Sequence, residues 1–368
     1  MAQSKFQGWV GHDADSVKGR MSWGEFKVKP FEDDDIDVSG ASLATHCGAG
    51  PIEVSHCGVC GSDLHVLSSG WGPAPYPIVV GHEIVGKVLK VGANVKHVTV
   101  GDRVGVGAQV KSCLRDDCPA CGHHEENHCA NDFVMTYGAK YKNGATVQGG
   151  CAKSWRGHSH FAVKIPDNIP SEQAAPMLCG GVTTYSPLKR HGAGPGKTVG
   201  VVGIGGLGHF ALLWAKALGA DRVVAISRGK EKAQDVAALG AVDYIATSES
   251  GWETKHANSI DLIVETAGPR PSTPYDGYLN LLSPRGVYVQ LGNSGQPLPP
   301  INPAPLIVKG VTITGSCIGS PSEIIKMLEL ASRNDVRAWV QTRPMDEANE
   351  AIIDFQAGKP RFRYCLVN

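Results

Sequence analysis

Residues 199–210, near the middle of the chain, read Val-Gly-Val-Val-Gly-Ile-Gly-Gly-Leu-Gly-His-Phe. A valine-rich run, typical of a buried strand, stops at a glycine cluster, and a helical pattern then continues to Leu218. Gly203, Gly205 and Gly208 have the G-x-G-x-x-G spacing, which suits a tight turn, close approach to a pyrophosphate and close helix packing. The helix N-terminus would offer N–H groups and a positive dipole end to phosphates.

The glycine spacing alone is weak evidence, because a chain with 46 glycines produces chance matches, and the flanking elements make it specific. A strand precedes it, a helix follows, and a second strand is expected over 221–226. We therefore predict a dinucleotide-binding unit whose turn also includes Gly206 and Leu207. The alternative is a glycine-rich turn in some other α/β unit.

The end of the second strand bears on the kind of dinucleotide. A unit that binds NAD usually carries Asp or Glu there, about 20 residues beyond the glycines, to bind the ribose 2′-hydroxyl. Residues 226–232 read Ile-Ser-Arg-Gly-Lys-Glu-Lys, with no carboxylate at the tip. Ser227, Arg228 and Lys232 could instead hold a 2′-phosphate by charge-assisted hydrogen bonds, which predicts NADP(H). The alternative is a solvated basic loop that opens a helix over 230–239.

Composition limits the remaining possibilities. The 368 residues suffice for two domains, and the 35 basic and 35 acidic side chains balance, so nothing favours nucleic acid or an anionic membrane as a partner. No apolar run reaches the length of a membrane span, and residues 1–5 lack the apolar core of a signal peptide. We expect a cytoplasmic protein. Several of the 11 cysteines cluster near His and Glu, which favours metal binding over disulfides.

The first 38 residues read as short strands and turns, with a strand beginning at Asp33 and reaching Val38. Residues 39–52 (Ser-Gly-Ala-Ser-Leu-Ala-Thr-His-Cys-Gly-Ala-Gly-Pro-Ile) then show no period. Without them, Val38 would join Glu53 in one alternating strand. This pattern raises the hypothesis that 39–52 is foreign to the fold, for example translated intron sequence; an ordinary surface loop is the alternative.

A first group of metal-binding residue types follows this break. Cys60 stands in Cys-Gly-Ser-Asp-Leu-His, and after a loop His82 and Glu83 stand side by side. Thiolate, imidazole and carboxylate are all donors that zinc accepts. Polar groups inside an otherwise apolar region need partners, and a metal would supply one.

A second group consists of four thiols within a polar stretch. Cys113, Cys118, Cys121 and Cys129 lie within seventeen positions, a pattern typical of a closed structural zinc site in a lobe over 112–130. Unbound surface cysteines are the alternative.

The remaining pattern divides the chain into two domains. Residues 86–107 alternate valines with turn glycines, as in a curled sheet, and Ser171 is expected to cap a helix that contains Cys179. Alternating strands and helices then predict a parallel, doubly wound sheet, followed by a helix over 322–333 capped by Ser322. A final strand over 361–367 is expected to return to the first domain. The predicted class is α/β, with 179–321 as the dinucleotide domain and 1–178 plus 322–368 as the other.

Taken together, these motifs resemble the zinc-dependent medium-chain alcohol dehydrogenases, and within them the NADP-dependent cinnamyl alcohol dehydrogenase branch with its fungal broad-specificity members. The resemblance covers nearly the whole chain. It is carried by Cys60-Gly61-Ser62-Asp63-x-His65, Gly81-His82-Glu83, the four-cysteine lobe, Leu178-Cys179-Gly180-Gly181 and the Gly203–Gly208 turn, which stand in the family's order.

The resemblance implies a Rossmann dinucleotide domain, a mainly antiparallel domain with a partly barrel-like GroES-like core, two zinc ions per chain and a homodimer. It implies that the catalytic zinc is held by Cys60, His82 and Cys179, with Glu83 in some states. Asp63 would orient His82, and Ser62 and His65 would relay a proton. Thr183 and Arg363 would contact the cofactor, Arg363 near its pyrophosphate. The structural zinc would be held by Cys113, Cys118, Cys121 and Cys129, although the family's first cysteine gap is two residues and here it is four.

The implied reaction is interconversion of an alcohol and an aldehyde, of aromatic (cinnamyl or benzylic) or medium aliphatic type, at zinc with NADP(H) as hydride carrier. Trp71, Pro73, Pro75 and Tyr76 are candidates to line the substrate pocket, with ordinary loop packing as the alternative. Two other functions remain open. One is an NAD-linked polyol dehydrogenase, against which the absence of an acidic residue at Ser227 argues. The other is a non-catalytic NADPH-binding relative, which would be expected to lack the zinc ligands.

Overall fold

A computed structural model describes residues 5–39 and 54–368, and these form two compact units. The second unit comprises residues 180–318 and 333–336, and the first unit comprises the rest. The chain thus changes units after Cys179 and after Ile318, where the sequence places the changes after residues 178 and 321. Within the described ranges, no helix combines the length and apolar character that a membrane span requires.

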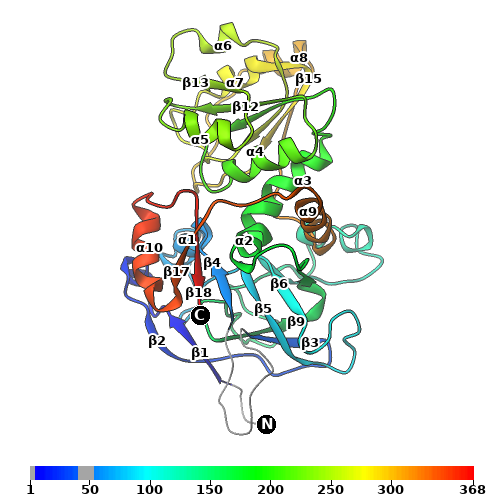
Figure 1. Cartoon of the computed structure of the whole chain (residues 1–368), viewed down its shortest axis with the longest axis vertical. Coiled ribbons are helices and arrows are strands. Elements are labelled where there is room, and N and C mark those ends of the chain that lie inside the picture. Colours follow the sequence, from blue (N-terminus) through cyan, green and yellow to red (C-terminus); the bar gives the residue numbers. More distant parts are fainter. Residues whose placement is uncertain (1–4, 40–53) are drawn as a thin grey trace. The chain divides into compact units, whose positions relative to one another are not determined.

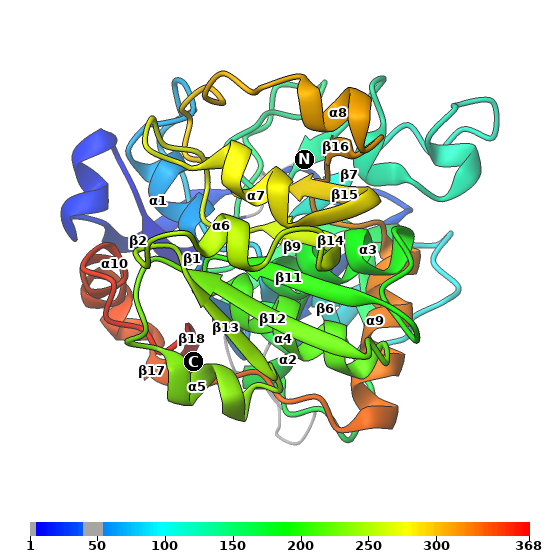
Figure 2. The same ribbon diagram turned by 90° about the horizontal axis from the view of Figure 1, so that it is seen from above.

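The second unit is built on a six-stranded parallel sheet in the order β13-β12-β11-β14-β15-β16. Helices lie on both sides of it, with α4 on one side and α7 on the other (Figure 2). The predicted doubly wound parallel sheet is confirmed. Its strands are β11 (Thr198–Val202), β12 (Arg222–Ser227), β13 (Asp243–Ala246), β14 (Ile260–Glu265), β15 (Leu282–Gln290) and β16 (Thr312–Gly315). Its helices are α3 (Val182–Arg190), α4 (Gly208–Ala217), α5 (Ala233–Ala238), α6 (Trp252–Lys255), α7 (Tyr275–Leu281) and α8 (Ala304–Val308).

The glycine turn joins the central strand of this sheet to a helix, as the sequence predicts. Strand β11 is buried along Val199–Val202, as expected for a strand covered on both faces. Gly203 has a φ of +83°, which favours glycine. A Cβ at Gly208 would lie 2.0 Å from the carbonyl oxygen of Gly203, so helix and turn approach too closely for any side chain there. A Cβ at Gly205 would meet nothing within 4 Å, which leaves that face of the turn open.

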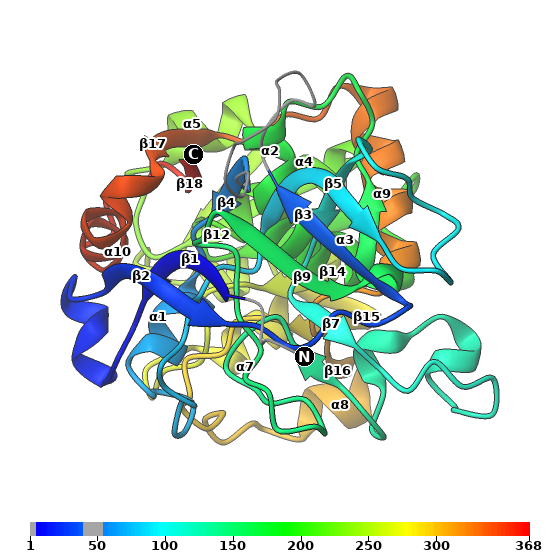
Figure 3. The same cartoon turned by 90° about the horizontal axis from the view of Figure 1, so that it is seen from below.

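The first unit contains an eight-stranded sheet whose main path is β10-β6-β5-β4-β18-β17, with β3 pairing both β5 and β9 (Figures 1 and 3). The pairings of β18 with β4 and β17 confirm that the C-terminal strand returns to this unit. The strands are β1 (Lys5–Val10), β2 (Ser22–Lys27), β3 (Asp35–Ser39), β4 (His56–Gly58), β5 (Ile84–Val91), β6 (Arg103–Val106), β7 (Gln109–Lys111), β8 (Val134–Met135), β9 (Ser154–His158), β10 (Ala162–Lys164), β17 (Val340–Pro344) and β18 (Arg363–Val367). The helices are α1 (Gly61–Leu67), α2 (Ser171–Pro176), α9 (Pro321–Asn334) and α10 (Ala348–Gln356).

Three helix starts differ from the prediction. Helix α5 begins at Ala233 and not at residue 230, so the basic residues before it lie in a turn. The Ser171 hydroxyl accepts from Arg103 at 3.1 Å, and Pro170 is the N-cap of α2. Ser320, not Ser322, caps α9: its hydroxyl accepts from the Glu323 N–H at 3.3 Å while the Glu323 carboxylate accepts from the Ser320 N–H at 3.1 Å. For α2 the partner of the serine is tertiary, and for α9 the capping serine lies outside the predicted helix.

Strands β3 and β4 lie end to end, although many residues separate them in sequence. On β9, Ser39 pairs with Ser154, and the Val54 N–H donates to the carbonyl of the next residue, Lys153. On β5, Ser39 pairs with Lys87 and His56 with Val85, so the three steps from Ser39 through Val54 to His56 oppose two steps on β5, as at a β-bulge. Ser39 and Val54 therefore occupy consecutive places in one strand, and fourteen residues, 40–53, separate them in sequence.

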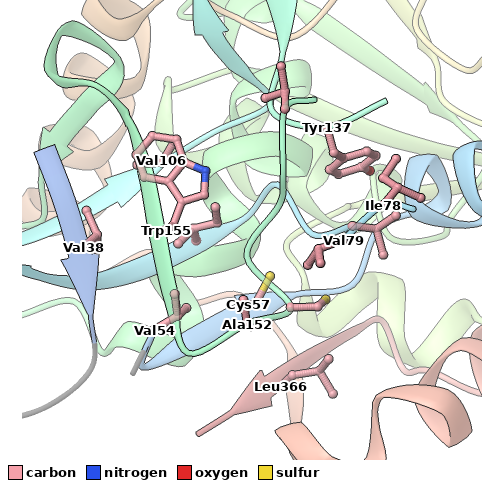
Figure 4. Packing of buried hydrophobic residues seen from close by; sticks show 14 of the residues in the cluster. Val38, Val54, Cys57, Ile78, Val79, Val106, Tyr137, Ala152, Trp155 and Leu366 are labelled. Carbon is pink, nitrogen blue, oxygen red and sulfur yellow. The ribbon is translucent and has the colours of Figure 1, made fainter. Parts of the chain in front are cut away.

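The core confirms that this strand is continuous. Ile36, Val38 and Val54 are fully buried. If Val54 is the second residue after Val38 in the strand, these three side chains alternate on one face, as in a single continuous strand. Val38 and Val54 belong to one apolar cluster with Trp155 and Cys57 (Figure 4). The segment that the sequence marks as foreign, 39–52, lies outside the described residues apart from Ser39 at its edge, and its origin stays a hypothesis.

Deleting residues 40–53 is therefore expected to stabilise the protein. The deletion joins Ser39 to Val54 without changing the pairing, and it removes a loop-closure cost of about 2 kcal/mol for a loop of this length. The melting temperature should rise by about 5 °C in a thermal unfolding scan, at a size where 1 kcal/mol corresponds to roughly 2–4 °C.

The register supplies a matched control. Deleting one residue fewer, 40–52, keeps Glu53 and moves Val54 to the opposite face of the strand, so this variant should melt below the chain that lacks 40–53. Equal or lower melting of the fourteen-residue deletion, relative to the full chain, would show that the segment contributes to the fold.

Candidate metal centres

Four side chains from three separate segments of the sequence converge in the first unit. One donor atom from each of Cys60, His82, Glu83 and Cys179 lies within 4.8 Å of the other three, and all four residues are buried. The sulfurs of Cys60 and Cys179 are 3.9 Å apart. Zinc–sulfur bonds of about 2.3 Å at tetrahedral angles separate two sulfurs by about 3.8 Å, so the two thiols fit zinc as they stand.

The elements around the cluster position these side chains. Cys60 is the N-cap of α1, and the backbone between Met177 and Gly181 is a π-helical turn that carries Cys179. Such turns are frequent at functional sites because they reorient a side chain within a helix. His82 and Glu83 immediately precede β5, after Gly81, whose φ is +99°. A Cβ at Gly81 would clash with Cys57 Sγ at 2.6 Å, so only glycine fits there.

Asp63 supports the cluster through backbone hydrogen bonds. Its carboxylate accepts from the backbone N–H of Cys60 at 2.8 Å and from that of Gly81 at 3.1 Å. It thereby ties together the two segments that carry Cys60 and His82. Neither ring nitrogen of His82 has a hydrogen-bond partner among the described residues, as expected of an imidazole whose nitrogens are available to a metal. Asp63 forms no direct hydrogen bond with His82, and its expected role in orienting that ring stays a prediction.

Arg363 lies beside the cluster. Its guanidinium is 2 % exposed and forms an ion pair with the Glu83 carboxylate. Burial raises the pKa of Glu83 to about 7, against the opposing charge of Arg363. Arg363 thus provides a buried positive charge beside three acidic donors, and its contact with a pyrophosphate stays a prediction. Sequence reasoning missed this pair because 280 positions separate the two residues.

The electrostatics of the cluster favour a thiolate at Cys60, while the hydrogen bond with Cys60 raises the pKa of Cys179. The hydrogen bond with Cys179 lowers the pKa of Cys60 well below its usual value. Burial lowers the pKa of His82, but the neighbouring Cys60 outweighs it and raises that pKa to about 9. A divalent cation would replace this proton as the counter-charge. The donor chemistry, the distances and the bare imidazole nitrogens all fit zinc.

The predicted proton-relay residues lie next to the cluster on one face of α1. The Ser62 hydroxyl is 3.7 Å from Cys60 Sγ, and His65 follows three residues later. The His65 imidazole stacks on the Trp71 indole with centroids 4.5 Å apart and planes at 12°. Burial lowers the pKa of His65, which keeps it neutral near pH 7. Tyr76, a candidate for the substrate pocket, instead donates its hydroxyl to the Leu67 carbonyl at 2.7 Å, which is ordinary loop packing.

The second cysteine group also converges. Each of its four sulfurs lies within 4.8 Å of the other three, and those of Cys113 and Cys121 are 3.6 Å apart. The longer first gap therefore does not keep Cys113 from the cluster. The Asn131 amide donates to Cys118 Sγ at 3.5 Å, and the Cys113 N–H to Cys129 Sγ at 3.5 Å. Four thiols with backbone and amide donors to sulfur form a closed site that fits a structural zinc ion.

In the second unit, the basic turn lies against the glycine turn. The Lys232 ammonium donates to the Ile204 carbonyl at 2.5 Å, which brings this side chain to the G-x-G-x-x-G segment. Ser227 is half-buried at the end of β12, and Arg228 is exposed beside it. Thr183 lies in α3, and its cofactor contact stays a prediction, as do the roles of the glycines and basic residues.

A dinucleotide-type parallel sheet together with two thiol-rich metal clusters defines the class of metal-dependent oxidoreductases that use a dinucleotide. Comparison with known proteins narrows this class. Residues 49–167 match the alcohol dehydrogenase GroES-like domain and residues 206–333 the zinc-binding dehydrogenase domain. The chain therefore belongs to the zinc-containing alcohol dehydrogenase family, and both the predicted family and its fold are confirmed.

Three relatives illustrate the similarity. NADP-dependent alcohol dehydrogenase 6 of Saccharomyces cerevisiae is 43 % identical over 347 residues, which is 93 % of this chain and 91 % of that protein. A probable mannitol dehydrogenase of Fragaria ananassa is 36 % identical over 99 % of this chain and 95 % of its own length. The structure of a cinnamyl alcohol dehydrogenase of Sorghum bicolor superimposes with a TM-score of 0.88 at 34 % identity, covering 99 % of this chain and 98 % of the other.

Proposed function

We propose that the protein is a zinc-dependent, NADP(H)-linked alcohol dehydrogenase that interconverts aromatic or medium aliphatic alcohols and aldehydes. The observation that carries the proposal is the buried cluster of Cys60, His82, Glu83 and Cys179, whose two sulfurs have the spacing of zinc ligands. When bound, zinc supplies Lewis-acid polarisation of the carbonyl and NADPH supplies the hydride.

The chain's own residues would prepare this chemistry. Cys60, His82 and Cys179 would hold the metal, with Glu83 as a further donor whose carboxylate forms an ion pair with Arg363. Asp63 keeps the Cys60 and His82 segments together through their backbone N–H groups. Ser62, beside Cys60, passes a proton between the substrate oxygen and His65, whose neutral imidazole accepts or returns it.

NADP(H) is preferred because the tip of β12 offers a hydroxyl and cations with no carboxylate. Ser227 and Arg228 bind the 2′-phosphate, and Lys232 bridges that site to the glycine turn. The naming of one relative as NADP-dependent agrees with this preference.

The substrate class is proposed as aromatic because the Trp71 indole, 43 % exposed, stacks on the relay residue His65. A flat apolar surface next to the proton relay suits a benzylic or cinnamyl ring. A polyol dehydrogenase is the second candidate, since one similar protein is named as a probable mannitol dehydrogenase.

Zinc analysis and a substrate panel test this function. The purified protein should contain two zinc ions per chain and oxidise NADPH with benzaldehyde, cinnamaldehyde and hexanal, at least about tenfold faster than NADH at equal concentration, as charge-assisted phosphate contacts imply. Oxidation of mannitol with NAD would favour the polyol activity. One zinc ion or none, with no turnover of either class, would favour a non-catalytic relative.

A homodimer in the cytoplasm is also proposed, from the family resemblance and from one surface of the second unit. Helix α8 has no buried residue, and its Ile307 and Val308 are 79 % and 82 % exposed. It precedes β16, which pairs only with β15 among the described strands and so leaves a sheet edge open. A second copy of this chain, related by a two-fold axis, would cover both features.

Replacing Ile307 with Asp is expected to convert the dimer to a monomer, because a charge in the interface centre would be buried without a partner. Sedimentation or light scattering measures the mass. Val242→Asp is the matched control, since Val242 is 67 % exposed near the opposite sheet edge and should stay dimeric. A dimeric Ile307→Asp variant would place the interface elsewhere.

A further inference from the structure

Tyr137 lies against the candidate zinc ligand His82, and nothing in the sequence pattern marks it. Its ring stacks on the His82 imidazole with centroids 5.1 Å apart and planes at 16°. The side chain is 1 % exposed and belongs to the apolar cluster of the first unit, near Ile78 and Val79 (Figure 4). One face of the imidazole is therefore covered by an aromatic ring.

The backbone holds Tyr137 firmly in this place. The preceding residue, Thr136, donates its N–H to the Ala108 carbonyl at 3.0 Å and its hydroxyl to the Gly107 carbonyl. The following residue, Gly138, has a φ of +72°, and a Cβ there would lie 3.1 Å from Val66. These contacts fix the residues on either side of Tyr137, so its ring has little freedom to move away from His82.

The Tyr137 hydroxyl is buried and has no hydrogen-bond partner among the described residues. It lies next to the carboxylate of Asp63, whose two oxygens already accept from the N–H groups of Cys60 and Gly81. Tyr137 thus stacks on a donor ring close to the group that ties the donor segments together.

We propose that Tyr137 is a positioning residue of the zinc site: its ring fixes the plane of the His82 imidazole. The inference rests on the proposed function, in which His82 binds zinc. A metal-bound imidazole must aim one nitrogen lone pair at the ion, and neither His82 nitrogen has another partner among the described residues to set the ring orientation. The Tyr137 ring orients the His82 imidazole before the metal binds, which lowers the entropic cost of ordering this ligand on binding.

The experiment compares three variants of the zinc-loaded protein. Tyr137→Leu removes ring and hydroxyl, Tyr137→Phe keeps the ring, and Tyr141→Leu is the matched control. Tyr141 lies on the same loop and in the same buried cluster, but it packs under Lys29, 5.5 Å from the ring centroid, and away from His82. The readouts are the rate of zinc release to a coloured chelator, the visible spectrum after cobalt substitution, and the melting temperature.

Tyr137→Leu is expected to release one of its two zinc ions about 10–100-fold faster than the unaltered chain, the usual effect of losing support around a ligand. Its cobalt spectrum should shift, because the imidazole geometry changes. The zinc release rate of Tyr137→Phe should lie within a few-fold of that of the unaltered chain. Tyr141→Leu should match the unaltered chain in zinc release rate and in cobalt spectrum, even if both leucine variants have lower melting temperatures.

The proposal is overturned if Tyr137→Leu keeps the zinc release rate and cobalt spectrum of the unaltered chain, or if Tyr141→Leu changes them as much. An unaltered chain that binds only one zinc ion would instead contradict the proposed function itself. The two failures are therefore distinguishable from the metal content of the unaltered chain.

Discussion

Replacing Cys60 with Ser is expected to lower the turnover of aldehyde by about a thousandfold or more. The substitution removes one of two sulfurs, 3.9 Å apart, that would hold the metal. Loss of the metal costs several kcal/mol of charge stabilisation at the reacting oxygen, and each 1.4 kcal/mol is about tenfold in rate. The measurement is steady-state NADPH oxidation, together with zinc content, which should fall from two ions per chain to one.

The fold should survive this change, because serine is a better N-cap for α1 than cysteine. NADPH binding, followed by fluorescence titration, should therefore stay within a few-fold. Cys317→Ser is the control, since Cys317 is exposed and lies in the second unit, outside both metal clusters. Full turnover by Cys60→Ser would refute the zinc assignment, and a similar loss in Cys317→Ser would show that serine substitution as such inactivates the protein.

Replacing Ser227 with Asp and Arg228 with Ala is expected to raise the KM for NADPH by about a hundredfold and to improve the use of NADH. A charge-assisted hydrogen bond contributes about 1.5–3 kcal/mol, and the new carboxylate adds repulsion towards a 2′-phosphate while it accepts from a 2′-hydroxyl. Lys232 is left in place, because its hydrogen bond to Ile204 also supports the glycine turn. Steady-state rates with both cofactors provide the measurement.

Lys230→Ala is the control in the same turn. The Lys230 ammonium forms an ion pair with Glu249 and so has a partner of its own. The cofactor preference of this variant should be unchanged, because an exposed ion pair contributes little. An unchanged KM for NADPH in the double variant, or an equal change in Lys230→Ala, would contradict a specific 2′-phosphate site at Ser227 and Arg228.

Those parts of the fold that depend on local patterns could be predicted from the sequence. The glycine turn appears as expected because a left-handed φ at Gly203 and the lack of space at Gly208 restrict these positions to glycine. The cysteine lobe could also be predicted, since its four thiols lie within seventeen positions of the sequence. The parallel strands of the second unit followed from their continuous valine-rich runs.

Helix starts and supporting contacts could not be predicted in the same way. Ser171 resembles an N-cap, but Arg103, 68 positions away, takes its hydroxyl. Asp63 resembles a partner of His82, and the hydrogen bonds that it forms with two backbone N–H groups could not be predicted. Tyr137 has no signature at all, because stacking on His82 depends on how two distant loops pack. Each of these outcomes is a competition between partners that are remote in sequence.

The sequence by itself determined which donors are available: the thiols, the imidazole, the glycines and the basic turn, each required by a local rule of spacing or backbone geometry. It also showed that a strand is interrupted after Val38. Only the tertiary structure decided that Cys179 joins Cys60, that Arg363 faces Glu83, and that Ser39 and Val54 are neighbours in one strand. Such pairings depend on burying charged and apolar groups together, and that energy exists only when the whole chain has folded.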